Sequence, residues 1–109
     1  MENKYEVSFE LILNAGNSKS KSLMAIESAR EFDFEEAEAL VKEAAEDLKA
    51  AHKSQTEMIQ GEARGEQQEI NVILIHAQDH LTTAMIMLEQ AKEFINIYKM
   101  LKDLKERGL

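Results

Sequence analysis

The chain contains no proline, and it has only four glycines in 109 residues. Because proline and glycine are the residues that most often interrupt helices and form turns, we expect long helices joined by few turns. The length suits one compact domain over residues 1–109 with a single hydrophobic core. Cysteine is also absent, which excludes disulfides, thiolate metal sites and cysteine nucleophiles and fits a reducing compartment.

Apolar residues recur at steps of three and four in three segments, near residues 4–31, 34–61 and 66–106. This spacing is that of one helical face. Because the connectors between the segments are short, neighbouring helices are expected to run in opposite directions. The sequence therefore predicts an all-α fold, an antiparallel three-helix bundle.

The first segment has one weak point as a helix, the run Gly-Asn-Ser-Lys-Ser-Lys-Ser at residues 16–22. Glycine, asparagine and serine disfavour helix interiors, but the apolar spacing resumes in phase after the run, so a continuous helix is expected. Two roles are open for Gly16 and Asn17: a close contact with another helix, which glycine permits, or a surface near the site of a neighbouring subunit. The expected core face comprises Tyr5, Phe9, Ile12, Leu13, Gly16, Leu23 and Ile26.

The second segment begins with a capping signal. Asp33 is placed to accept hydrogen bonds from the exposed backbone amides of the new helix, and Glu36 is placed to reciprocate. The helix is expected to end near Gly61, where two glycines four residues apart mark a connector. Its expected apolar face comprises Ala37, Leu40, Val41, Ala44, Leu48, Ala51, Met58 and Ile59.

The formal net charge of -8 disfavours nucleic-acid binding, which depends on clustered lysine and arginine, and favours basic partners. No stretch near the N-terminus resembles a signal peptide, and no segment approaches a membrane span in length. The expected location is the cytoplasm, with no membrane insertion or anchor.

The third segment carries apolar residues on two opposite faces. At about 100° per residue, the face expected to pack in the core comprises Ile70, Ile73, Ala77, Leu81, Ala84, Leu88, Ala91, Ile95 and Tyr98. The opposite face, termed the association stripe below, comprises Val72, Ile75, Asp79, Thr82 and Ile86. A single bundle leaves this stripe exposed. Because exposed contiguous apolar surface usually marks an interface, self-association with cyclic symmetry is expected.

Asp79 lies in the middle of the association stripe. Cyclic association brings its carboxylate close to those of the other copies, and like carboxylates in an apolar interface do not all stay ionised without a proton or a cation between them. A divalent cation such as magnesium, bound through oxygen ligands, resolves this conflict. The alternative is a looser dimer in which Asp79 faces solvent.

Two of the three histidines, His76 and His80, stand one helical turn apart on the flank between the core face and the association stripe. One imidazole nitrogen can act as a nucleophile while the other is held by a hydrogen bond, which suits reversible phosphorylation. The residues alone leave three alternatives: polar histidines without a chemical role, a zinc half-site, or a non-catalytic helical oligomerisation or adaptor module. Metalloprotease chemistry is disfavoured because Ala77, rather than glutamate, follows the first histidine.

Residues 73–81, Ile-Leu-Ile-His-Ala-Gln-Asp-His-Leu, resemble the signature of the lactose/cellobiose family of IIA components in the phosphoenolpyruvate-dependent sugar phosphotransferase system. The resemblance also covers residues 13–17, Ser20, and residues 33–37, 51–56 and 65–66, in the family's order and spacing.

The resemblance implies a cytoplasmic homotrimer of three-helix subunits. It implies that His76 accepts a phosphoryl group from the histidine-containing phosphocarrier protein and passes it to a cysteine of a IIB component, during uptake of a disaccharide of the lactose/cellobiose class. It also implies that Asp79 is the ligand of a divalent cation, expected to be magnesium, at the trimer axis. We therefore expect His76 to be the phosphoryl acceptor, with His80 and Gln78 supporting the site.

Two regions depart from the family's pattern. Thr82 stands where a methionine is common, and because it lies on the association stripe it bears on the tightness of the trimer. Ser18, Lys19 and Lys21 stand where arginine or alanine is common near the Gly-Asn run. Neither departure affects the expected nucleophile.

Overall fold

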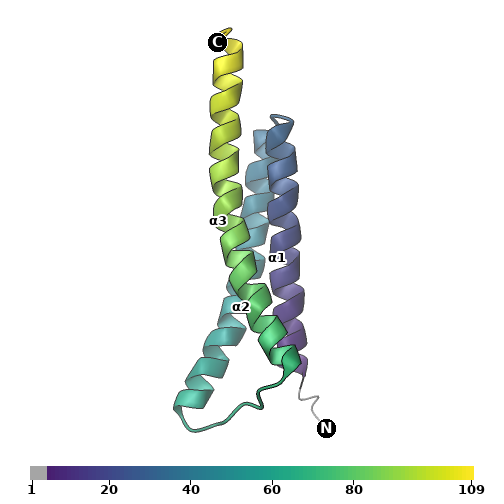
Figure 1. The fold of residues 1–109 in the computed structure, drawn as a ribbon, viewed down its shortest axis with the longest axis vertical. Helices are drawn as coiled ribbons and strands as arrows, with labels where there is room; N and C mark the ends of the chain where they lie inside the picture. Colours follow the sequence, from purple (N-terminus) through teal and green to yellow (C-terminus); the bar gives the residue numbers. More distant parts are fainter. Residues whose placement is uncertain (1–4) are drawn as a thin grey trace.

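The computed structural model describes residues 5–109 and consists of three helices, α1 (Glu6–Arg30), α2 (Phe34–Ala63) and α3 (Val72–Glu106). Figure 1 shows α1 and α2 as an antiparallel pair, with α3 running back beside them and its last turns extending past the turn between α1 and α2. The molecule measures 62 × 24 × 20 Å. The described residues contain no strand, so the predicted all-α arrangement of three antiparallel helices is confirmed.

The first helix is continuous through residues 16–22, as predicted. Its buried face, however, differs from the predicted one. Phe9 is 50% exposed and Leu13 is 62% exposed, and neither lies in the core. The buried residues of α1 are instead Ser8, Leu11, Ala15, Ser18, Ser22, Ala25 and Ala29.

Small side chains explain why this face of α1 is the buried one. Alanine and serine let helices approach closely, and α1 packs against both α2 and α3. Most buried hydroxyls are hydrogen-bonded. The Ser18 hydroxyl donates to the carbonyl oxygen of Ala44 on α2, at 2.8 Å, whereas the buried Ser22 hydroxyl has no partner among residues 5–109. The predicted face was wrong for Phe9, Leu13 and Leu23, which are exposed, whereas Ile12 packs against the core as predicted.

The turn between α1 and α2 confirms half of the predicted capping arrangement. The Asp33 carboxylate accepts from the backbone amide of Glu36 at 3.2 Å. The amide of Asp33 donates to the carbonyl of Ser28 at 2.9 Å, so the turn itself provides the partner that was expected from the Glu36 side chain.

The connector between α2 and α3 is longer than predicted. The second helix ends at Ala63, and Gly65 follows with a φ of 90°, a left-handed conformation that glycine adopts without strain. The third helix begins at Val72, not near residue 66, because Asn71 caps it: the Asn71 side-chain oxygen accepts from the amide of Leu74 at 2.8 Å. Ile70 therefore lies in the connector and is 77% exposed, outside the core in which it was expected.

The core consists of two clusters along the bundle, in which alanines separate a few large side chains. Of the predicted core face of α3, the residues from Ala77 to Ile95 are buried as expected, and Tyr98 is half-buried. One cluster comprises Leu11, Ala15, Ala51, Ala77, Leu81 and Ala84, and the other comprises Ala25, Ala29, Ala37, Leu40 and Ile95.

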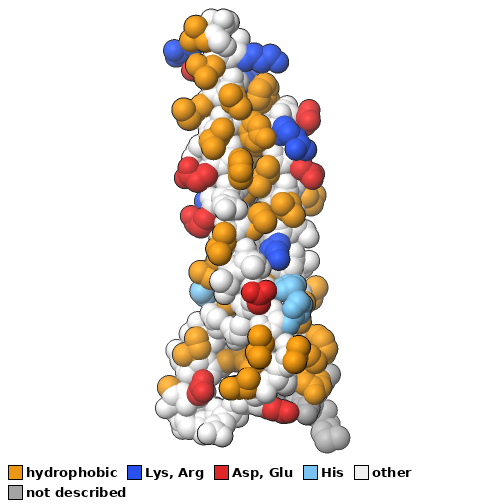
Figure 2. Space-filling model, in the orientation of Figure 1, with side chains coloured by type: hydrophobic (Ala, Val, Ile, Leu, Met, Phe, Trp, Pro, Cys, Tyr) orange, Lys and Arg blue, Asp and Glu red, His pale blue; other side chains and the backbone are white. Residues whose placement is uncertain are grey.

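The association stripe is exposed in the single chain, as predicted. All five of its residues are exposed, with Val72 at 80%. Further along α3, Phe94, Ile97, Met100, Leu101 and Leu104 are exposed as well, and Figure 2 shows hydrophobic side chains along most of the length of the visible face. Within residues 5–109, no helix combines the length and the apolar character needed to cross a membrane.

Candidate functional site

The histidine pair lies in the first third of α3. His76 is exposed and His80 is half-buried, with ring centroids 4.3 Å apart and ring planes inclined at 55°. This proximity follows from their spacing, since side chains four residues apart on a helix are neighbours. Figure 2 shows histidine side chains at the surface with an acidic and a basic side chain beside them.

The environment of His80 favours its neutral form. Burial lowers the pKa of the ring below its ordinary value of 6.5, and the neighbouring His76 and Lys19 lower it further, while Asp79 and the backbone of His76 act in the opposite direction. The Nδ1 atom of His80 is buried and has no hydrogen-bond partner among residues 5–109. At neutral pH, His76 therefore stands beside an uncharged imidazole.

Gln78 faces α2 rather than His76. Its side-chain oxygen accepts from the Gln55 amide nitrogen at 2.6 Å, and at about 100° per residue it lies on the far side of α3 from His76. The structure therefore does not bring Gln78 together with the histidine pair within one chain. It ties α3 to α2 at the level of the site.

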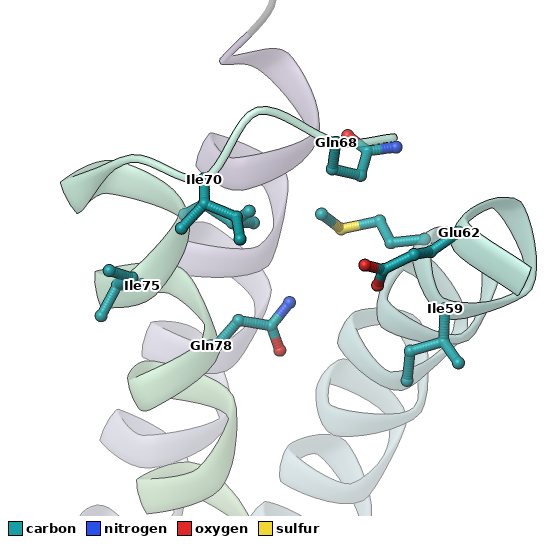
Figure 3. Close-up of a pocket in the computed structure, with 8 residues that line it drawn as sticks. Ile59, Glu62, Gln68, Ile70, Ile75 and Gln78 are labelled. Atoms are coloured by element: carbon teal, nitrogen blue, oxygen red, sulfur yellow. The ribbon is translucent and has the colours of Figure 1, made fainter. Parts of the chain in front are cut away.

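Gln78 also lines a pocket of about 320 Å³ between α2 and α3. Figure 1 shows the end of α2 diverging from α3 here, with the connector crossing the gap. Figure 3 shows the Glu62 carboxylate on α2 pointing toward Gln78 across the pocket, which Ile59 also lines. Its remaining lining residues are Met58, Gln68, Ile70, Leu74 and Ile75. The lining is mostly apolar and holds neither histidine, so the pocket is separate from the candidate site.

Asp79 is exposed on the association stripe and points away from the core. The hydroxyl of Thr83 donates to the backbone carbonyls of Asp79 at 3.0 Å and of His80 at 3.1 Å, so it is occupied within the helix. No group of three or more histidine, aspartate or glutamate side chains that could hold a metal occurs among residues 5–109. One chain thus supplies Asp79 as a single carboxylate, and the histidine pair lacks the further ligands of a zinc site.

Gly16 makes no close helix contact in this chain. A Cβ built on it meets no atom of α2 or α3 within 4 Å, so packing of Gly16 itself against α2 or α3 is excluded. The third histidine, His52, lies on α2 beside Lys49 and Lys53 and does not join the pair.

Lys19 on α1 bears on the histidine pair through its charge, which the sequence pattern did not indicate. It was noted only as a departure from a family pattern, yet its charge acts on His80 from another helix. The available signal was its position in α1, four residues after Ala15 and three before Ser22, both of which are fully buried.

Comparison with known proteins agrees with this geometry. The family model for "PTS system, Lactose/Cellobiose specific IIA subunit" matches residues 6–99. The lichenan-specific phosphotransferase enzyme IIA component of Bacillus subtilis is 42% identical over 107 residues, which cover 98% of this chain and 96% of that protein.

Solved structures show the same likeness. The PTS cellobiose-specific enzyme IIA from Bacillus anthracis superposes with a TM-score of 0.92 at 46% identity, covering 94% of each chain. A chain of the IIA(Chitobiose)-HPr complex superposes with a TM-score of 0.81 at 33% identity, covering 94% of this chain and 99% of the other.

The three-helix fold with an exposed histidine on its last helix is thus that of a phosphotransferase component of the sugar phosphotransferase system. Within that class, the chain belongs to the lactose/cellobiose-specific IIA family.

Proposed function

We propose that this IIA component accepts a phosphoryl group on His76 from a histidine-containing phosphocarrier protein. It then transfers the group to a cysteine of a IIB component, in the cytoplasm, during uptake of a disaccharide of the lactose/cellobiose class. The observation that carries the proposal is the difference between the two histidines. A carrier must present its acceptor to two proteins in turn, and His76 is exposed whereas His80 is half-buried with one nitrogen shielded.

The chemistry needs little beyond this arrangement. A ring nitrogen of neutral His76 attacks the phosphorus, the donor's P–N bond breaks, and its electron pair returns to the donor imidazole. A cysteine thiolate of the IIB component then forms a P–S bond, and the P–N electron pair returns to His76. Neither step requires a net proton transfer, so the protein has to supply mainly in-line positioning and charge stabilisation.

The similar proteins support the assignment of partners and sugar. The chitobiose IIA forms a complex with HPr, which supports a donor of that kind for this chain. Relatives carry names that refer to lichenan, cellobiose and N,N'-diacetylchitobiose, which supports a sugar of more than one unit. The IIB cysteine as acceptor follows from the family resemblance.

We further propose that three copies assemble through the association stripe and that their Asp79 carboxylates bind a divalent cation, expected to be magnesium, at the symmetry axis. Carboxylate oxygens are the donors that magnesium prefers, and the exposed position of Asp79 between Ile75 and Ile86 fits a ligand contributed by each copy. The cation would offset the repulsion between the carboxylates. In this scheme, the His80 ring lies next to the His76 ring, and Gln78 keeps α2 and α3 in place.

Phosphorylation by phosphoenolpyruvate with the general proteins of the system tests the acceptor. We expect His76→Gln to remove the acid-labile phosphate and the control His80→Gln to retain it, with mass spectrometry locating the group. Labelling of the His76→Gln variant would contradict the assignment. Absence of label from the unaltered chain would favour a non-catalytic oligomerisation module.

Sedimentation with and without a chelator tests the assembly. We expect a trimer that loosens when the divalent cation is removed, and Asp79→Asn should abolish the response to the chelator. A monomer that ignores the chelator would contradict both the trimer and the metal.

A further inference from the structure

We propose that the Gln78 side chain of one copy completes the site of His76 in the neighbouring copy, where its amide group donates hydrogen bonds to the phosphoryl oxygens. This inference rests on the proposed function and on the threefold assembly proposed with it. It gives Gln78 a role that a single chain does not allow, since within one chain Gln78 faces α2 and lies away from His76.

The two side chains lie on opposite flanks of α3. His76 and Gln78 are two residues apart, which places them about 200° apart around the helix. Gln78 is on the flank that faces α2, where it accepts from Gln55 at 2.6 Å, whereas His76 is exposed on the other flank. The association stripe, with Ile75 and Asp79, lies between the two flanks on the exposed side of α3.

Threefold symmetry brings these flanks together. In a closed ring each copy presents one flank to one neighbour and the opposite flank to the other, and positions that border an apolar seam on parallel helices meet across the interface. With the axis along the association stripe, the Gln78 flank of each copy therefore meets the His76 flank of the next. Two residues rise about 3 Å along a helix, so the two side chains lie at nearly the same height and a glutamine side chain spans the difference.

The surfaces beside the two flanks are both apolar, and both are uncovered in the single chain. On the histidine side, α1 exposes Phe9 at 50% and Leu13 at 62%. On the Gln78 side lies the pocket of about 320 Å³ between α2 and α3, whose mostly apolar lining includes Ile59 and Ile75, each 58% exposed. Since Ile75 also belongs to the association stripe, a copy that covers the stripe reaches the mouth of the pocket.

The heights of these surfaces also agree. Leu11 of α1 packs in one cluster with Ala77 of α3, so Phe9 and Leu13, which flank Leu11 in the sequence, lie level with the start of α3 and with the pocket. A rotation about an axis parallel to α3 keeps this height, so the exposed α1 face of one copy meets the pocket of the next. A second copy therefore fits both surfaces, and this contact sets the amide beside the neighbouring histidine.

The Gln78 amide has the chemistry that a charged site needs. Its oxygen accepts the bond from Gln55, which leaves the amide N–H groups to donate, and Figure 3 shows this amide in the gap between α3 and α2. A phosphoryl group adds a charge of roughly -1.5 to -2 at neutral pH. Hydrogen bonds to such charged oxygens are stronger than those between neutral groups, and a neutral amide donates them without taking part in proton transfer.

Mixed assemblies test whether Gln78 acts on the neighbouring copy. Gln78→Leu keeps the acceptor and loses the amide, whereas His76→Gln keeps the amide and loses the acceptor. Phosphoryl transfer from the phosphorylated carrier protein is measured for each variant alone and after the two are unfolded and refolded together in equal amounts. We expect Gln78→Leu alone to lower kcat about tenfold with little change in KM for the donor protein. In the mixture, about half of the intact histidines gain a neighbour with Gln78 and return to the full rate, seen as a fast phase.

Gln55→Leu is the matched control, because it breaks the same bond between α2 and α3 but keeps the Gln78 amide. We expect it to lower kcat much less than Gln78→Leu does, with circular dichroism and sedimentation checking that every variant folds and assembles. Because the chain has no cysteine, a double variant, Leu13→Cys with Ile59→Cys, adds an independent measurement. Oxidation should link its copies into covalent dimers and trimers, and neither single variant should form these links.

Three results would overturn the inference. One is a mixture that transfers no faster than the sum of its two components, since Gln78 then acts only within its own chain. Another is an equal loss of kcat in Gln55→Leu and Gln78→Leu, which would show a structural role alone. The third is an absence of cross-links in the assembled double variant. The proposed function fails separately, by absence of label on His76 in the unaltered chain.

Discussion

Truncation of Leu11 tests the buried face of α1 most directly. Leu11 is fully buried and packs in one cluster with Ala15, Ala51, Ala77 and Leu81. Leu11→Ala removes three carbons, which corresponds to about 2.4 kcal/mol of lost transfer free energy at about 0.8 kcal/mol per carbon. The cavity that remains raises the total loss in the free energy of unfolding to about 3–4 kcal/mol. With a urea slope of about 2 kcal/mol/M, the unfolding midpoint falls by roughly 1.5–2 M.

Leu13→Ala is the matched control, because the apolar spacing of the sequence assigned Leu13 to the core, whereas the structure leaves it 62% exposed. Its truncation is expected to lower the free energy of unfolding by about 1 kcal/mol or less. Urea unfolding followed by circular dichroism, with both variants at the same protein concentration and checked by sedimentation, measures the difference. Equal losses in the two variants without a change in assembly would refute the assignment of the buried face.

Three further predictions concern helix α1, the start of α3 and the histidine pair. Gly16→Ala is expected to raise the free energy of unfolding by about 0.5–1 kcal/mol, because the position is helical and no atom of α2 or α3 lies near an added Cβ. A variant whose assembly is weakened in sedimentation would instead place a neighbouring subunit against Gly16. Asn71→Ala removes the cap of α3 and should cost about 1 kcal/mol, seen as faster amide exchange in the first turn of α3, so unchanged exchange there would contradict the capping role. The folded-state pKa of His80 lies below the unfolded value of 6.5. The unfolded state therefore binds more protons between the two pKa values, and the free energy of unfolding falls as the pH drops through about 6.5. Urea unfolding across this range should show a smaller fall for His80→Gln, and an identical pH profile for the variant would contradict the shift.

The helices themselves were predictable because their signals are local. Helix α1 continues through residues 16–22 because the apolar spacing on either side is in phase, and α2 begins where Asp33 caps it. The start of α3 was missed because Asn71 acts as a cap only when the connector reaches it in extended conformation, which depends on where α2 ends. A local pattern of charged and polar residues at 66–69 did not reveal this.

The candidate site was predictable only in part. The spacing of His76 and His80 determines that their rings meet on one helix, and this needs no tertiary information. The direction of Gln78 toward Gln55 depends on how α2 is placed beside α3. No periodicity within one helix contains that placement.

The amino-acid sequence by itself determined that the chain is helical, where the histidine pair stands, and that α3 has two apolar faces. It did so because helix propensity and the 3.6-residue helical period depend only on residues that are close together in the sequence. Only the tertiary structure decided which face of α1 is buried, because that depends on how closely α2 and α3 approach, and close approach selected the alanines and serines over the larger side chains. It also directed Gln78 of α3 toward Gln55 of α2, since contacts between helices are set by packing and not by the spacing along any one of them.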